Sequence, residues 1–143
     1  MAITTSAITS SFKRELLAGD HDIAASGDTL KLTLYTDSST IGPGLASYTA
    51  SGEVGNSGDY TAGGKTLAGQ TTSLSGTTAI ADFTDLSYLT ATISAMGALI
   101  YNSSKSNKSI AVLDFSTVKT STAGTFTIQF PNYTDTLAII RLA

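Results

Sequence analysis

The sequence predicts a mainly β fold, an antiparallel β-sandwich resembling a jelly roll, with one short helix near the N-terminus. Short apolar runs recur at a spacing of about 8 to 15 residues after position 28, and Ser, Thr, Gly and Asn separate them. No sustained helical periodicity follows position 18. The length of 143 residues fits a single domain, residues 1–143. Such a domain buries about 68–70% of its unfolded surface.

The N-terminal segment predicts an arm followed by a helix. Residues 1–10 alternate small apolar and hydroxyl residues, a pattern of an extended arm that is too weakly apolar to hold itself down. Residues 11–18 predict a short helix with Ser10 or Ser11 as its cap and Gly19 as its stop. Because so short a helix is unstable alone, the face with Phe12 and Leu16 must pack on the sheet or on another subunit.

The clearest strand pattern lies at residues 28–36. Leu30, Leu32 and Leu34 alternate with polar or amphipathic residues, so one face is expected in the core and the other, with Thr33 and Tyr35, in solvent. Residues 37–60 predict a long surface excursion punctuated by glycine. Its tyrosines, Tyr48 and Tyr60, are candidate exposed contact residues, with lids over the sandwich edge as the alternative interpretation.

Further strands are expected at residues 66–68, 79–83 and 90–96, with a Ser/Thr/Gly loop at residues 71–78. The last third, residues 97–143, contains four apolar runs, at 98–101, 110–115, 125–130 and 137–142, which predict a meander. The wholly polar gap at residues 102–109 predicts a hairpin whose exposed tip presents Lys105 and Lys108.

The final run, residues 137–142, is continuously apolar apart from one arginine and predicts a central strand buried on both faces. Adjacent apolar residues in the meander, such as Val112 and Leu113, point to opposite faces of their strand. Either these strands are covered on both sides by the chain itself, or one face meets another subunit.

No residue pattern predicts catalysis, a cofactor or a metal site. Cysteine is absent, and the single histidine, His21, lacks a defined nucleophile or convergent ligands, so a hydrogen bond at the helix end or a solvated turn is expected for it. Gly63-Gly64-Lys65 lacks the Walker spacing, and Asp82 with Asp85 lies in a stretch that gives no sign of burial. We therefore expect the protein not to be an enzyme.

The distribution of charged and apolar residues speaks against two classes of partner, nucleic acids and membranes. The net charge is −3 and the eight Lys and Arg are scattered, so the clustered positive charge of a nucleic-acid interface is missing. No stretch approaches the roughly 20 apolar residues of a membrane span, and no secretory signal precedes the domain. Charged residues amount to only 13%, so the surface is polar but nearly uncharged.

Six segments together resemble a family of structural proteins from tailed-bacteriophage virions, of the kind found in marine and cyanobacterial phages. They are SSFKRELLAGDH (10–21), DTLKLTLYT (28–36), YTAGGKTL (60–67), GALIYN (97–102), IAVLDF (110–115) and GTFTIQFP (124–131). The resemblance spans nearly the whole chain and implies a capsid decoration, cement or head-fibre-like protein. It implies no catalytic, cofactor or metal residues.

The resemblance also implies partners and a location: the major capsid protein, and self-association as a dimer or trimer, on the capsid surface of a virion made in the host cytoplasm. Avidity from many modest contacts would suit such a module. The candidate capsid-docking residues are the apolar ones of the N-terminal segment, Ile3, Ile8, Phe12, Leu16 and Leu17. The alternative is a tail or head-fibre adaptor, or a receptor module that stacks glycans on exposed tyrosines.

Overall fold

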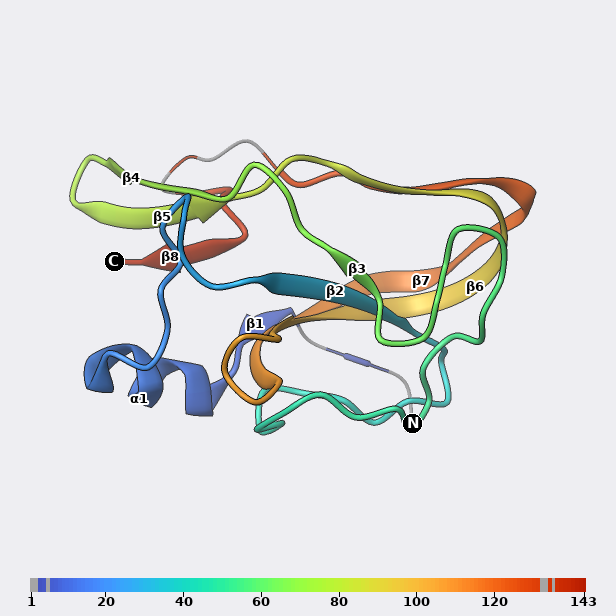
Figure 1. Cartoon of the computed structure of the whole chain (residues 1–143), viewed down its shortest axis with the longest axis horizontal. Coiled ribbons are helices and arrows are strands. Elements are labelled where there is room, and N and C mark those ends of the chain that lie inside the picture. Colours follow the sequence, from blue (N-terminus) through green and yellow to red (C-terminus); the bar gives the residue numbers. More distant parts are fainter. Residues whose placement is uncertain (1–2, 5, 132–133, 135) are drawn as a thin grey trace.

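Two antiparallel sheets and one helix make up the fold (Figure 1). The structure, a computed structural model, describes residues 3–4, 6–131, 134 and 136–143. The larger sheet has the order β1-β7-β6-β2-β3 and the smaller one β4-β5-β8. The elements are β1 (Ala7–Ile8), α1 (Ser10–Ala18), β2 (Leu30–Tyr35), β3 (Lys65–Thr66), β4 (Thr71–Ser75), β5 (Thr78–Asp82), β6 (Leu86–Asn102), β7 (Lys108–Ile128) and β8 (Ile140–Leu142). The predicted class, mainly β and antiparallel with one short N-terminal helix, is confirmed.

The two longest strands, β6 and β7, form one hairpin that bends through both layers of the molecule. Figure 1 shows them running along the top, turning at the right and returning below toward β2. The register between β6 and β7 slips at several points, and between Ala95 and Gly97 the partner on β7 jumps from Lys119 to Asp114. Bulges of this kind bend a strand and increase its twist. One hairpin therefore supplies strands to both layers.

The bend also requires a glycine. A Cβ at Gly97 would lie 2.3 Å from the carbonyl oxygen of Leu113 and 2.6 Å from Cδ1 of Ile3. The strand predicted at residues 90–96 is confirmed as part of β6. The predicted meander is wrong in its strand count, because residues 116–124, expected as a break between two strands, are part of the single bulged strand β7. The polar tip is confirmed: the hairpin closes at Asn102 opposite Lys108.

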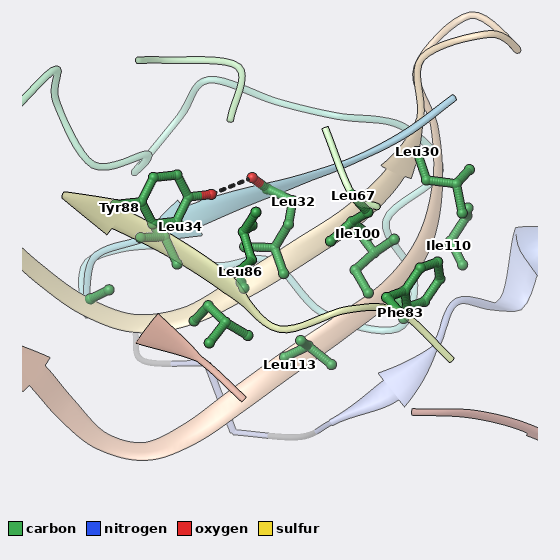
Figure 2. Close-up of a cluster of buried hydrophobic side chains, with 14 of the residues drawn as sticks. Leu30, Leu32, Leu34, Leu67, Phe83, Leu86, Tyr88, Ile100, Ile110 and Leu113 are labelled. Atoms are coloured by element: carbon green, nitrogen blue, oxygen red, sulfur yellow. Dashed lines mark hydrogen bonds between the residues drawn. The ribbon is translucent and has the colours of Figure 1, made fainter. Parts of the chain in front are cut away.

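The main core lies between the layers. It joins leucines of β2 to side chains of β6, β7 and the β5–β6 segment, among them Ile100, Ile110, Phe83 and Leu86 (Figure 2). Tyr88, at the start of β6, donates a hydrogen bond of 2.9 Å from its hydroxyl to the carbonyl oxygen of Leu32 on β2. This bond ties the upper layer to the lower one.

The second face of β2 is also covered, contrary to the expectation that it lies in solvent. Thr33 and Tyr35 are fully buried. Tyr35 packs in a second apolar cluster with Ile3, Ile41, Leu99, Tyr101 and Val112, which the excursion after β2 helps to close. Val112 belongs to this cluster and Leu113 to the main core, so the chain itself covers both faces of the strand.

The expected free arm is wrong for the described residues of the N-terminal segment, while residues 1, 2 and 5 lie outside them. Ile3 is 1% exposed, and Ala7 and Ile8 pair with Val112 and Ala111 of β7. The helix follows directly, capped by the buried Thr9 and not by Ser10 or Ser11, and it ends at Gly19 in the left-handed conformation as predicted. The N-terminal segment is too weakly apolar to order by itself. It packs against the larger sheet because Gly97, which has no side chain, leaves room for Ile3.

The smaller sheet differs most from the prediction. Residues 71–78, expected as a loop, form β4 and the turn into β5. The final strand is short and lies at the sheet edge beside β5, not at the centre. Leu142 is 44% exposed, so this strand is not buried on both faces. Hydrophobicity alone could not distinguish an edge strand from a central one here.

Candidate functional site

The five residues predicted to dock on a capsid lie in different environments. Ile3 and Phe12 are buried in the two apolar clusters, and Ile8 and Leu16 are half-buried against the main core. Only Leu17 is free in solvent, with 93% of its surface exposed. Most of the predicted docking set therefore packs within the fold, and Leu17 is its one largely exposed member.

The four predicted contact residues are likewise divided. Tyr60, at 1% exposure, is a core residue, and the prediction that it is exposed is wrong. Tyr48 is half-buried and stacks on Tyr101 with ring centroids 5.0 Å apart. Lys105 is exposed, as expected, whereas Lys108 is half-buried and forms an ion pair of 3.1 Å with Asp20.

A carboxylate in the excursion explains why these tyrosines face inward. Glu53 accepts hydrogen bonds from the Tyr48 hydroxyl at 2.6 Å, the Tyr60 hydroxyl at 2.8 Å and the Gly63 amide at 2.7 Å. The Tyr60 hydroxyl in turn accepts from the Leu34 amide of β2. Charge-assisted bonds of this kind are stronger than neutral ones. The cluster fastens the excursion to the sheet.

Burial also changes the acidity of these hydroxyls. It raises the pKa of Tyr35 to about 12. Burial likewise raises the pKa of Tyr48, Tyr60 and Tyr88, and the negative charge of Glu53 raises each of them further. A tyrosine that reacts as an acid or base near neutral pH would need the opposite shift, so these groups are structural.

These shifts predict a loss of stability in alkali. Because the folded-state pKa of Tyr35 lies above the unfolded value of about 10, its contribution is complete below pH 10 and declines as pH rises toward 12. We expect the melting temperature to fall steeply above pH 10, as measured by circular dichroism. The Tyr35→Phe variant should show a shallower decline than the unmodified chain. Equal slopes for the two proteins would contradict the assignment.

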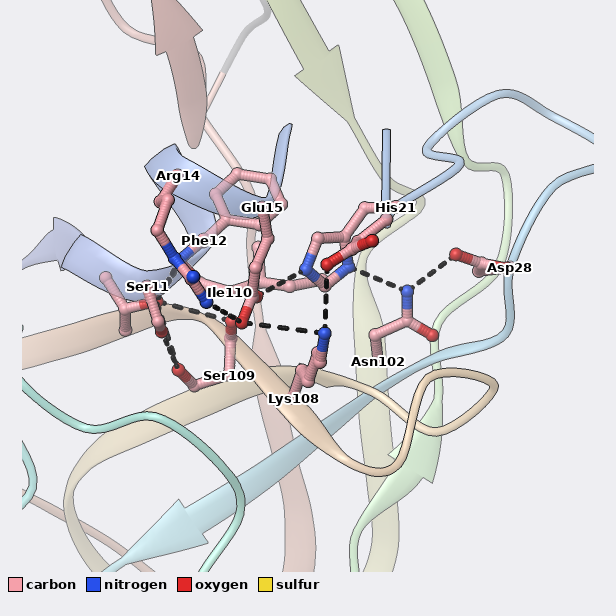
Figure 3. Close-up of polar contacts among 12 residues, drawn as sticks. Ser11, Phe12, Arg14, Glu15, His21, Asp28, Asn102, Lys108, Ser109 and Ile110 are labelled. Carbon is pink, nitrogen blue, oxygen red and sulfur yellow. Dashed lines mark hydrogen bonds and ion pairs between the residues drawn. The ribbon is translucent and has the colours of Figure 1, made fainter. Parts of the chain in front are cut away.

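A polar cluster joins α1 to the tip of the β6–β7 hairpin (Figure 3). His21, whose side chain is 0% exposed, lies 2.8 Å from Glu15 Oε2 through Nε2 and 2.9 Å from Asn102 Nδ2 through Nδ1. The Lys108 ammonium bridges Glu15, at 3.7 Å, and Asp20. The sequence predicted a hydrogen bond at the helix end or a solvated turn for His21; the bond is present, and the side chain is buried.

An apolar groove of about 140 Å³ lies between α1 and the smaller sheet. Phe12 and Leu16 of α1 contribute one wall, and the opposite wall is the face of β4, β5 and β8 that turns toward the core. Ala81 and Ile140 occupy this face where it meets the main core. Ile23, after α1, also lines the groove.

The sheet face continues beyond the part that the core covers. The register aligns Leu74, Ala79 and Leu142 in one row across the three strands, two residues along from the row of Ala81 and Ile140. Leu74 is 72% exposed. Aliphatic side chains in register on an uncovered face are typical of a contact surface. Sequence analysis missed this row because it assigned Leu74 to a loop and Leu142 to a buried central strand.

The described residues contain neither a metal-binding cluster nor a membrane-spanning helix. No group of three or more His, Cys, Asp or Glu side chains in the described part of the chain could hold a metal ion. The sole helix among the described residues, α1, is far shorter than a membrane-spanning helix requires. Comparison of the chain with protein-family models, with curated proteins and with solved structures returns no match.

Proposed function

We propose that this chain is a bacteriophage virion structural protein that decorates the capsid, binding the major capsid protein as an oligomer. One observation carries the proposal beyond the sequence resemblance: the aliphatic row Leu74, Ala79 and Leu142 is partly exposed, and it extends the groove that Ala79 and Leu142 line. The surface is small, so each copy would bind weakly and the repeated lattice would supply avidity. The proposed docking surface is thus the groove and this row, and not the N-terminal arm.

The alternative of a glycan-binding module depended on exposed tyrosines. Among the five tyrosines that the structure describes, only Tyr48 is not buried, and its hydroxyl is bonded to Glu53. No observation favours that alternative over a protein contact.

The proposal predicts a specific pattern of variants in virions. Leu74→Asp and Leu142→Asp should each lower capsid occupancy by at least about tenfold, because docking would bury an unpaired carboxylate. Leu89→Asp is the matched control: Leu89 is an exposed leucine that does not line the groove, and its replacement should leave occupancy unchanged. Occupancy would be measured as copies per particle by quantitative mass spectrometry of purified virions.

Two outcomes would contradict the proposal. Six or twelve copies per particle would place the protein in the tail machinery, and absence from virions would exclude a structural role altogether. Chemical cross-linking adds an independent test, because Lys13 lies on α1, whereas Lys119 lies on the distal half of β7. Cross-links to the major capsid protein from Lys119 and none from Lys13 would reject the groove as the docking surface.

A further inference from the structure

The imidazole of His21 uses both of its nitrogens in a site closed to solvent. Neutral imidazole carries one N–H donor and one acceptor nitrogen. Nε2 faces the Glu15 carboxylate, which can only accept when ionised, so Nε2 carries the hydrogen. Nδ1 faces the side-chain amide of Asn102. The tautomer at neutral pH is therefore the Nε2–H form, provided that Asn102 presents its NH2 group to the ring.

The orientation of Asn102 is determined by two further partners. Its Nδ2 lies 2.7 Å from Asp28 Oδ2, and its Oδ1 accepts a hydrogen bond of 3.0 Å from the Ser104 amide. With the amide turned over, an oxygen would face the Asp28 carboxylate and an NH2 group would face the Ser104 N–H, so both bonds would be lost. Both hydrogens of the Asn102 amide are thus engaged, one on Asp28 and one on Nδ1 of His21.

The charges around the ring come close to cancelling. Three carboxylates surround His21: Glu15 on α1, Asp20 on the turn that follows and Asp28 before β2. Each is matched by a cation: Arg14 and Lys108 lie near Glu15, Lys108 near Asp20, and Lys105 at 3.9 Å from Asp28. Because three cations balance the three carboxylates, little net charge remains at the ring. The hydrogen-bond pattern therefore decides whether the neutral or the protonated imidazole fits the site.

We infer that His21 is a proton-sensitive latch, which holds the C-terminal end of α1 in place while its imidazole is neutral and releases it in mild acid. A proton from solvent that binds Nδ1 turns this acceptor into a donor, 2.9 Å from the Asn102 amide, whose hydrogens point toward it. Since Asn102 cannot turn over without losing Asp28 and Ser104, the imidazolium must leave the site. The segment after α1 then loosens.

The released segment adjoins the groove. The ring of His21 packs against Phe12 with centroids 5.0 Å apart, and Phe12 with Leu16 forms the helical wall of the groove. If the groove is the docking surface, as proposed above, mild acid would weaken docking. The latch itself does not depend on that function and is testable on the isolated chain.

The aspartates of the cluster do not titrate in the same pH range. A hydrogen bond and the charge of Lys108 lower the pKa of Asp20. For Asp28, burial opposes ionisation, but hydrogen bonds from the Asp22 amide and Asn102 outweigh it and the pKa is lowered. Both carboxyls therefore stay ionised at pH 5 and above.

Amide hydrogen exchange followed by NMR tests the latch directly. The Gly19 and Asp20 amides close the end of α1 on the carbonyl oxygens of Leu16 and Glu15. Their protection, corrected for intrinsic exchange, should fall between pH 7.5 and 5 by up to about tenfold per pH unit, the limit for one proton. The Val54 amide, bonded to Leu34 far from the cluster, should keep its protection.

The variant His21→Gln supplies the control, because its amide can accept from Asn102 and donate to Glu15 but cannot gain a proton. It should protect Gly19 and Asp20 equally at both pH values. Constant protection in the unmodified chain, or the same decline in His21→Gln, would overturn the latch. Should the variant fold poorly, the ¹⁵N shifts of the unmodified ring decide: an Nδ1–H tautomer at pH 7.5 overturns it too.

The latch and the docking function fail separately. If the Gly19 and Asp20 amides lose protection from exchange in acid but the protein is absent from virions, the latch is supported and the proposed function is rejected. If the protein is found on capsids and the protection of these amides does not change with pH, only the latch is rejected.

Discussion

The variant Phe12→Ala should lower the free energy of unfolding by about 3–5 kcal/mol, the range for truncating a buried phenylalanine. Phe12 is 0% exposed, belongs to the main core and contacts the His21 ring. Its loss would leave a cavity beneath α1, which cannot close because Thr9 and Glu15 tie the helix at both ends. Urea unfolding followed by circular dichroism would measure the change.

The matched control for this prediction is Leu17→Ala on the same helix. Leu17 is almost wholly in solvent, so its truncation should change the free energy of unfolding by no more than about 0.5 kcal/mol. Similar stabilities for the two variants would show that α1 is not anchored through Phe12.

Replacing Glu53 by alanine should lower the free energy of unfolding by at least about 3 kcal/mol, because it leaves three donors without their acceptor at about 1–3 kcal/mol each. The Tyr60 hydroxyl would keep its bond from the Leu34 amide but lose the partner that orients it. The excursion after β2 should then detach from the sheet and expose Tyr35. Urea unfolding would give the stability change.

Glu53→Gln and Asp37→Ala complete this test. Glutamine keeps one acceptor oxygen, so a loss smaller than that of alanine is expected. Asp37 is an exposed acid of the same excursion, and its removal should be neutral within about 0.5 kcal/mol. A cost below about 1 kcal/mol for Glu53→Ala would mean that water replaces the carboxylate and that the cluster does not hold the excursion.

The acidic-side and alkaline-side responses involve different parts of the molecule. The stabilising contribution of the Tyr35 hydroxyl declines only above pH 10, whereas the latch proposed for His21 is tested in mild acid. Measurements of the whole chain at pH 8 to 9 therefore report the fold before Tyr35 begins to ionise.

Local signals were sufficient for much of the fold. The alternation of Leu30, Leu32 and Leu34 predicted the core face of β2, and Gly19 predicted the end of α1. The polar tip at residues 102–109 predicted the turn between the two long strands. Each of these features depends on residues that are neighbours in sequence, where period and turn chemistry act directly.

The candidate site was less predictable, because its parts come from distant segments. The groove combines α1 with strands near residues 72–81 and 140–142, and only the fold places them opposite one another. Leu74 and Leu142 carry no local sign of which sheet face they occupy, since that depends on the register with β5. His21 likewise becomes a buried, two-partner imidazole only when Asn102 reaches it.

The sequence by itself determined the class of fold, the strand periodicity, the helix end and the hairpin tip, because these follow from backbone preferences and side-chain alternation over a few residues. Only the tertiary structure decided that both faces of β2 are covered, that Tyr60 and Ile3 lie inside, and that the last strand lies at an edge with Leu142 exposed. The physical reason is that burial depends on what a remote segment brings to a face. Here the excursion and the N-terminal segment cover one side of the larger sheet, while Leu74 on the smaller sheet stays 72% exposed.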